Sequence, residues 1–561
     1  MKKEIKKYSY PSRIPIKNRH WPDNIITKSP TWCSVDLRDG NQALPIPMTP
    51  ERKISYFKML CSIGFKEIEI GFPSASQDDY DFTRLLIEKK KIPDDIRISV
   101  LTQAREHLVA KTVQALKGVK EAILHCYVAA SDLHAQLVFN KKREEVMEMS
   151  VKGTELVIKY LEAENMLKNI SYEFSPEEFT DSDLDFVISL SEAVYETWRS
   201  KSKKQFILNL PATVERRPPY QYADMIEYFI SKYKYSKDTI ISVHAHNDQG
   251  CAVAATEMAL LAGAQRVEGT LFGHGERTGN VDIVTLSLNL HSRGINTGLN
   301  FKNMNSIVKV VEESSGIPVH PRHPYAGSLV FTAFSGSHQD AIRKGLAQKE
   351  KAREIFGISW KIPYLHIDPA DIGRKYEKII RINSQSGKGG AVFVLENDFG
   401  YRPPKEMHPE IGNVIQKLAD KKKTEISAEE VEAEFKKTFF NIDYPLKLIS
   451  FHSSSSFDQK NVIANVKFSL KNELFSEKAE GNGPVSAVVH ALKQIGKIYE
   501  FSIEDFSEQA LGRTAEATAI AYVSVRRSSD NKIIFGAGEH SNIEYAAILA
   551  LFSAVNRGWK E

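Results

Sequence analysis

The sequence TWCSVDLRDGNQ, residues 31–42, begins as a β-rich run and ends in charged side chains. An amphipathic segment, PERKISYFKMLCSIG at residues 50–64, follows it. This order of strand and then helix continues to about residue 325, because seven more β-rich runs alternate with segments in which apolar residues recur at a helical period. The runs are KEIEIGF (66–72), IRISVLT (96–102), EAILHCYVA (121–129), ISYEF (170–174), FILNLPA (206–212), TIISVHAH (239–246) and RVEGTLF (266–272). Eight such units close most naturally into an α/β TIM (β/α)8 barrel.

The alternative is an open, doubly wound sheet, which also alternates strand and helix. Polar side chains at the strand ends favour the barrel, because a barrel gathers the carboxyl ends of all its strands at one mouth. These polar residues are Arg38, Asp39, His125, Ser175, Glu177, Thr213, His244, His246 and Asn280.

The rest of the chain divides into three further segments. Residues 1–30 are rich in Pro and Lys, and we expect an arm that packs on something else, with an order that depends on a partner subunit. The catalytic barrel spans 31–325. In 326–445 short helices with connectors are expected at 331–346, 360–378 and 427–440, with Ser427 and Glu430 forming a capping box. Residues 446–561 resemble two related halves, each with strands, a Gly-containing turn and an apolar helix, and predict a small α/β domain.

Composition excludes several classes of function. A net charge of +4 over 561 residues, without a long basic stripe, argues against nucleic acid as a partner. No apolar run approaches a membrane span, and the Lys-rich start lacks the apolar core of an export signal. Four scattered cysteines do not form a disulfide framework. We therefore expect a cytoplasmic protein without a membrane partner.

A pair of histidines supplies the strongest chemical signal. His244 and His246 lie two residues apart on a predicted strand, so both side chains leave one face and can chelate one divalent ion. A structural role for such a pair is about equally common. Polar residues directly after the pair favour the metal, because burying them without a function is costly.

The end of the first run supplies the partners for this pair. Asp39 would add an anionic oxygen ligand, which gives a mixed N/O site suited to Mg, Mn, Zn or Co. Arg38 would stand beside it, ready for a carboxylate or a developing oxyanion. The alternative is a structural Arg–Asp ion pair, which the adjacent Gly40 disfavours because it permits close backbone approach.

Two glycine-rich stretches carry weaker signals. GHGERTGN at 273–280 follows the eighth run, where TIM barrels often bind anions, although a plain turn and a Glu276–Arg277 surface pair explain it equally well. SQSGKGGA at 384–391 lacks the spacing of a phosphate loop, and we reject that interpretation.

Taken together, these motifs resemble the Asp-Arg-Glu metallolyase TIM barrels, and among them the alpha-isopropylmalate synthase/homocitrate synthase family in its long, 2-isopropylmalate synthase form. The resemblance runs through WCSVDLRDGNQAL, HAHNDQGCAVA, GHGERTGN, AFSGSHQDAIRKG, PYLHIDPADIGR and the terminal EGNGPVSA. It covers nearly the whole chain.

The resemblance assigns roles to twelve residues. Asp39, His244 and His246 match metal ligands, with Asn280 in or next to their shell, and His125, Ser175, Asn209 and Thr213 match residues around the 2-oxo acid. The residues matched to catalytic roles are Arg38, Glu177, His338 and Tyr364. In the family, the last two reach the site from the other subunit, which implies a homodimer.

The implied reaction condenses acetyl-CoA with 2-oxoisovalerate and hydrolyses the thioester to 2-isopropylmalate and CoA, on the way to leucine. It implies a divalent cation (Mg2+ before Mn2+ or Zn2+), with K+ as a possible activator. His338, oriented by Glu177, is the preferred base for the acetyl methyl proton, and Arg38 the stabiliser of the alkoxide. The terminal domain resembles a leucine-binding regulatory domain. Homocitrate synthase, citramalate synthase and a non-catalytic leucine sensor remain as alternatives.

Overall fold

The computed structural model describes residues 9–333, 336–358, 360–376, 389–422, 426–455, 461–511 and 517–559. The chain forms two compact units. The first consists of residues up to Phe331 together with His366–Tyr376, and the second of Thr332–Leu365 and the chain from residue 377 onward. Among the described residues, no helix combines the length and the apolar character needed to cross a membrane.

The first unit is a closed barrel of eight parallel strands, and each expected β-rich run contributes one of them. Neighbours in sequence pair along the ring, and β8 closes it against β1 with Trp32 opposite Val267. The strands are β1 (Thr31–Ser34), β2 (Glu67–Glu69), β3 (Arg97–Gln103), β4 (Ala122–Ala129), β5 (Ile170–Glu177), β6 (Phe206–Ala212), β7 (Thr239–Ala245) and β8 (Arg266–Gly269). The prediction of a TIM barrel rather than an open sheet is therefore confirmed.

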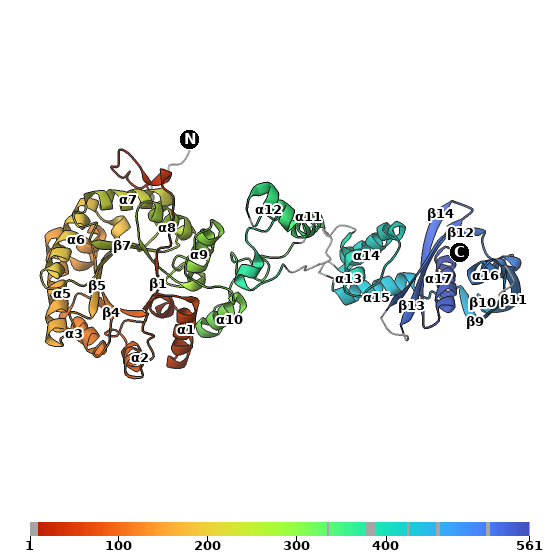
Figure 1. The fold of residues 1–561 in the computed structure, drawn as a ribbon, viewed down its shortest axis with the longest axis horizontal. Coiled ribbons are helices and arrows are strands. Elements are labelled where there is room, and N and C mark those ends of the chain that lie inside the picture. The colour runs from red at the N-terminus through yellow and green to blue at the C-terminus, as the bar shows by residue number, and fades with distance from the viewer. Residues whose placement is uncertain are drawn as a thin grey trace. The chain divides into compact units, whose positions relative to one another are not determined.

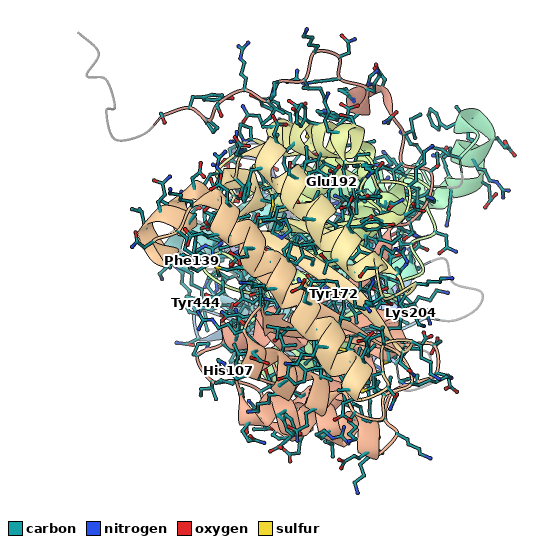
Figure 2. The ribbon with its side chains drawn as sticks, turned by 90° about the vertical axis from the view of Figure 1, so that its left-hand side faces the viewer. His107, Phe139, Tyr172, Glu192, Lys204 and Tyr444 are labelled. Carbon is teal, nitrogen blue, oxygen red and sulfur yellow. The ribbon has the colours of Figure 1, made fainter. Side chains whose placement is uncertain are left out.

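Helices form the outer layer of the barrel (Figure 1). They are α1 (Pro50–Ile63), α2 (Gln77–Glu88), α3 (Glu106–Ala115), α4 (Asp132–His134), α5 (Arg143–Ala163), α6 (Leu184–Arg199), α7 (Pro219–Lys232), α8 (Ala252–Leu261), α9 (Ile283–Ser292) and α10 (Met304–Ser315). Figure 2 looks onto this layer from the side of α5 and α6, with Tyr172 of β5 labelled. The Tyr172 hydroxyl lies 3.0 Å from the Thr154 hydroxyl of α5, and its ring packs on Trp198 of α6, which fastens both helices to the strand.

The arm before the barrel is anchored on its own chain. Arg19 donates two hydrogen bonds of 2.7 Å to the buried carboxylate of Asp224 on α7, and the Trp21 indole N–H donates a third, of 2.9 Å. The backbone N–H of His20 donates to Glu227. Residues 19–21 of the arm therefore pack on α7 of the same chain, and the dependence of the arm's order on a partner subunit stays a prediction.

The second unit begins with helices. They are α11 (Gly336–Ala347), α12 (Lys349–Phe356), α13 (Gly389–Asn397), α14 (His408–Lys422) and α15 (Ala428–Phe439). Ser427 and Glu430 form the expected capping box at the start of α15. A helix is expected within 360–378, and the described part of this stretch, 360–376, contains one 3-10 turn, Pro369–Ile372, because Pro363 and Pro369 remove backbone donors from it. The rejected phosphate-loop motif lies largely outside the described residues.

Two βββα units make up the C-terminal part, as the internal similarity predicts. The first contains β9 (Leu446–Ser454), β10 (Val462–Leu470), β11 (Glu473–Gly481) and α16 (Pro484–Gln494). The second contains β12 (Phe501–Leu511), β13 (Thr518–Arg527), β14 (Lys532–His540) and α17 (Ile543–Arg557). Both sheets are antiparallel, and the two units share one hydrophobic core. Glycine permits close helix packing here, because a Cβ at Gly538 would lie 2.0 Å from the Ala546 carbonyl oxygen of α17.

Candidate active site

The carboxyl ends of the barrel strands surround a cavity of about 180 Å³. Eight of the twelve residues that the sequence singled out line it: Arg38, His125, Ser175, Glu177, Asn209, Thr213, His244 and His246. Asp39 and Asn280 lie directly against the two histidines, whereas His338 and Tyr364 belong to the second unit. The structure therefore brings ten of the twelve to one mouth.

Three potential metal ligands converge at this mouth. Asp39 Oδ2 lies 3.3 Å from His244 Nε2 and 3.6 Å from His246 Nε2, and the two Nε2 atoms are 3.3 Å apart. A point equidistant from three atoms so spaced lies about 2 Å from each, which is the distance at which Mg²⁺ and Zn²⁺ bind oxygen and imidazole nitrogen. Asp39 Oδ2 is buried and makes no hydrogen bond among the described residues. The residues present thus fit a divalent cation.

The electrostatics of the three residues favour a positive charge between them. Burial disfavours ionisation of Asp39, but Arg38 and the two histidines hold its pKa below the usual range. Burial likewise opposes protonation of His244, yet the neighbouring carboxylates of Asp39 and Glu268 raise its pKa to about 9. For His246, burial and the neighbouring His244 lower the pKa to about 4. One imidazole is thus already neutral, as metal binding requires.

A buried carboxylate orients the first histidine. His244 Nδ1 lies 2.8 Å from Glu268 Oε2, so that Nδ1–H donates to the carboxylate and Nε2 is left as the ligand atom. Glu268 also accepts from Arg266, whose guanidinium is buried among Glu67, Glu173 and Glu268. Burial opposes ionisation of Glu268, but Arg266 and His244 hold its pKa well below the usual range.

Asn280 lies next to the second histidine. It forms an isolated β-bridge with His246, and its Nδ2 donates to the His274 carbonyl at 2.9 Å. Its Oδ1 is buried and makes no hydrogen bond among the described residues. This carbonyl oxygen is a further acceptor beside the metal ligands. Gly275 has φ +140°, and a Cβ there would lie 2.1 Å from Asn280 Nδ2, which explains one glycine of the GHGERTGN loop.

Arg38 occupies a single π-helical turn, Asp36–Gly40, directly after β1. Such turns are frequent at functional sites. The Nε of Arg38 donates to Glu69 Oε2 at 2.5 Å, and its Nη1 lies 3.7 Å from Asp39 Oδ1. Although burial opposes the charge, Glu69 and Asp39 raise the pKa of Arg38. The guanidinium is therefore permanently charged, is oriented by Glu69 and lines the cavity beside the candidate metal ligands.

A chain of hydrogen bonds connects three of the four residues matched to the 2-oxo acid. His125 Nδ1 lies 2.8 Å from Glu69 Oε1, and its Nε2 lies 2.7 Å from Ser175 Oγ. Asn209 donates to Ser175 Oγ at 3.0 Å, while its own Oδ1 is buried without a hydrogen bond among the described residues. Thr213 accepts from the Glu178 N–H at 2.9 Å. These contacts fix the walls of the cavity.

Glu177 ends β5 at the edge of the cavity. Burial raises the pKa of its carboxyl group, and the nearby His134 opposes the rise. A carboxyl group with a raised pKa in a cleft is suited to proton exchange. A surface pair of Glu276 with Arg277 was one alternative for the GHGERTGN loop; instead, Arg277 donates to Asp248 at 2.8 Å and to the Thr213 carbonyl at 2.6 Å. Arg277 thus connects the loops that follow β6, β7 and β8.

His338 and Tyr364 form a pair in the second unit. Their rings stack with centroids 4.1 Å apart and an interplanar angle of 27°. Tyr364 is 64% exposed and adopts φ +62°, an uncommon conformation for a bulky residue. An exposed aromatic pair with a strained backbone is more typical of a functional surface than of packing.

Sequence reasoning missed two carboxylates that organise the site, Glu69 and Glu268. Both lie inside runs that were interpreted as strands, KEIEIGF and RVEGTLF. An acidic side chain within a buried strand was the available signal, because it requires a buried partner. The apolar walls of the cavity, Phe72, Leu101, Tyr127 and Pro211, and the polar Gln42 were also not identified.

Three family models match most of the chain. Residues 29–311 match the family model described as HMGL-like, residues 328–396 match alpha-isopropylmalate synthase, post-catalytic domain-like, and residues 425–559 match the LeuA allosteric (dimerisation) domain. The chain is also similar to the solved HMG-CoA lyase of Bacillus subtilis, with a TM-score of 0.42, 22% identity and coverage of 53% of this chain and 96% of that chain.

Three relatives that match over nearly their full length share one name. The 2-isopropylmalate synthase of Clostridium acetobutylicum is 48% identical over 556 residues, 98% of this chain and 99% of that protein. Those of Thermobifida fusca and Acetoanaerobium sticklandii are 47% and 45% identical, over 97% and 98% of this chain and 96% of each relative. With this identity over nearly its full length, the chain belongs to the 2-isopropylmalate synthase family.

Proposed function

We propose that this chain is an acyltransferase that condenses acetyl-CoA with 2-oxoisovalerate and hydrolyses the thioester, giving 2-isopropylmalate and CoA in the first committed step of leucine biosynthesis. One observation carries the proposal. Asp39, His244 and His246 converge beside the guanidinium of Arg38, in a cavity whose walls are polar at His125, Ser175 and Asn209. The names of the relatives support the same activity.

Asp39, His244 and His246 would hold the divalent cation, with Asn280 next to them and Mg2+ as the first expectation before Mn2+ or Zn2+. When bound, a divalent cation at this position supplies Lewis acidity toward the carbonyl group of the 2-oxo acid. Arg38, held by Glu69, donates hydrogen bonds to the oxygen on which charge develops as the new carbon–carbon bond forms. Because Glu69 fixes the guanidinium before the reaction, no reorganisation is needed at that moment.

His125, Ser175, Asn209 and Thr213 bind and orient the 2-oxo acid. The buried Asn209 Oδ1 lacks a hydrogen bond, and the Ser175 hydroxyl lies between Asn209 and His125. Polar groups fixed in this way position the carboxylate and ketone, while Phe72 and Leu101 limit the space for the side chain. The fit of the 2-oxo acid's own side chain against these residues distinguishes 2-oxoisovalerate from the substrates of homocitrate and citramalate synthase.

Removal of the acetyl methyl proton requires a base, and we assign it to His338, with Tyr364 stacked on it and Glu177 as the acidic partner in the cavity. In this proposal His338 and Tyr364 of one copy serve the cavity of the other copy in a homodimer. Their exposure and the strained backbone of Tyr364 support a role in contacts beyond the compact unit that carries them.

The C-terminal part is proposed to dimerise and to bind leucine as an inhibitor, with the effector near the glycine turns. The match to the LeuA allosteric (dimerisation) domain supports this assignment. The functional division would then be arm 1–30, barrel 31–325, linker 326–445 and regulatory domain 446–561. The proposed enzyme is cytoplasmic, with K+ as its activator. Deleting residues 446–561 should abolish leucine inhibition with activity retained. Unchanged sensitivity to leucine would refute the assignment.

The test of the activity is thiol release from acetyl-CoA with a panel of 2-oxo acids. A strong preference for 2-oxoisovalerate and 2-isopropylmalate as the product would support the proposal. Preference for 2-oxoglutarate or pyruvate would assign homocitrate or citramalate synthase instead. No turnover with any acid, together with leucine binding, would support a non-catalytic sensor.

A further inference from the structure

The segment that carries His338 and Tyr364 leaves the barrel unit and returns to it. The first unit runs to Phe331 and resumes at His366, so that residues 332–365 form an excursion whose two flanks both belong to the barrel unit. The covalent connections of this excursion to the barrel unit are its two flanks, 320–331 before it and 366–376 after it.

One guanidinium joins the two flanks. Arg374, on the returning flank, donates from Nη1 to the carbonyl oxygens of Tyr325 (3.3 Å), Ala326 (2.9 Å) and Gly327 (2.8 Å) on the departing flank. Its guanidinium carbon also lies 5.5 Å from the centre of the Phe331 ring. We call Arg374 with these three carbonyls the flank clamp.

The departing flank is shaped to present these carbonyls. Tyr325 adopts φ +62°, and a Cβ at Gly327 would lie 2.3 Å from the Pro321 carbonyl oxygen. The turn is therefore tight, and three successive carbonyls converge on one donor. The Tyr325 hydroxyl donates to Asn289 of α9 at 2.8 Å, which fixes the clamp to the barrel.

The excursion itself is packed as one body. A Cβ at Gly345 of α11 would lie 2.7 Å from Cδ of Pro363, the Trp360 indole donates to the Leu365 carbonyl at 3.1 Å, and Lys349 lies 5.0 Å from the centre of the Trp360 ring. Because His338 and Tyr364 stack within this body, an orientation set at the flanks is passed to both residues.

We propose that Arg374 is a positioning residue for the reaction, which fixes the direction in which residues 332–365 present His338 and Tyr364. It is not among the residues that line the barrel cavity, and it acts through the backbone of its own flanks. The inference rests on the proposed function, because it needs His338 to take part in turnover.

The test uses the full-length enzyme with Mg2+ and a double-mutant cycle. R374M keeps an unbranched side chain of similar length that can lie on Phe331 but lacks the hydrogen-bond donors. R374K restores hydrogen-bond donors. The matched control is R353M, on the exposed face of α12. We expect R374M to lower kcat about tenfold or more with the KM for 2-oxoisovalerate nearly unchanged, because misplacement of a reacting group affects the chemical step. R374K should recover part of the loss, and R353M should behave as the native enzyme.

In the H338A background, R374M should change kcat by less than about twofold, because the two residues act through one step. If R374M lowers kcat by the same factor in both backgrounds, or not at all in the native one, the proposal is overturned. Native activity of H338A overturns it as well, by removing the residue to be positioned. Failure of the proposed function is a separate result, since the native enzyme would then release no thiol with any 2-oxo acid.

Discussion

Replacing Glu268 with glutamine changes one oxygen of the site to an NH2 group and leaves its volume nearly the same. In the native protein, Glu268 accepts from His244 Nδ1 at 2.8 Å and from Arg266 Nη1 at 2.8 Å. A glutamine satisfies only one of these donors. If its oxygen faces Arg266, its NH2 group faces His244, and the imidazole must then carry its proton on Nε2, the proposed ligand atom. If its oxygen faces His244, the NH2 group opposes the guanidinium.

Either arrangement costs a buried, charge-assisted hydrogen bond, worth about 1.5–3 kcal/mol. Mutation of the residue that orients a metal-binding histidine typically lowers metal affinity 10–100-fold, or by about 1.4–2.7 kcal/mol, which agrees with the energy of the lost hydrogen bond. We therefore expect E268Q to weaken Mg2+ or Mn2+ binding by about one to two orders of magnitude. Arg266 keeps Glu67 and Glu173 as partners, so the barrel should remain folded.

The assay is competition for the metal with a chromophoric chelator, with circular dichroism to check the fold. The matched control is E121Q, because Glu121 is an exposed residue just before β4, at the opposite end of the barrel, and pairs with Lys204 at 2.8 Å. A folded E268Q protein that binds the metal as tightly as the native protein, within about twofold, would refute the assignment of His244 as a ligand oriented by Glu268.

Three further predictions concern the site and the C-terminal part. The pKa of His244 is raised to about 9, so a metal ion must displace a proton from this residue at neutral pH. Chelator competition should therefore show an apparent metal affinity that rises by up to about tenfold per pH unit from pH 6.5 toward 9. An affinity that does not change with pH would contradict this. R38K should lower kcat by about 10²–10³ at saturating metal, because the single nitrogen of lysine cannot replace both the Nε that binds Glu69 and the separate Nη donors of the guanidinium. Steady-state rates near the native value would rule out the role of Arg38. G538A should lower the Tm, because its Cβ would collide with α17 and overpacking costs about 1–3 kcal/mol. G483A is the control and should leave the Tm unchanged, because a Cβ there has open space around it. Equal melting curves for the two variants would contradict the packing argument.

The barrel was predictable because its signals are local. Each strand is a short apolar run, each helix repeats its apolar residues along one face, and the closure of eight such units follows from their number. The convergence of the three candidate metal ligands was predictable for the same reason. His244 and His246 share a strand face, and Asp39 follows the first strand at the position where a barrel opens.

The organising contacts were not predictable, because they depend on side chains brought together by closure of the barrel. Glu69 reaches Arg38 and His125 from a different strand, and Glu268 reaches His244 across β7 and β8. The anchoring of the arm through Arg19 on Asp224 is also a contact between distant residues. The roles of His338 and Tyr364 came from the family resemblance alone, since no spacing in the sequence connects them with the barrel.

The most direct test of the account is the rate of thiol release with acetyl-CoA and 2-oxoisovalerate before and after removal of metal by EDTA, followed by addition of Mg2+ or Mn2+. The account predicts that activity is lost with EDTA, returns with either cation in the native enzyme, and does not return at the same cation concentration when His246 is replaced by alanine. Full activity in the presence of EDTA, or full recovery in the H246A variant, would contradict the metal site formed by Asp39, His244 and His246.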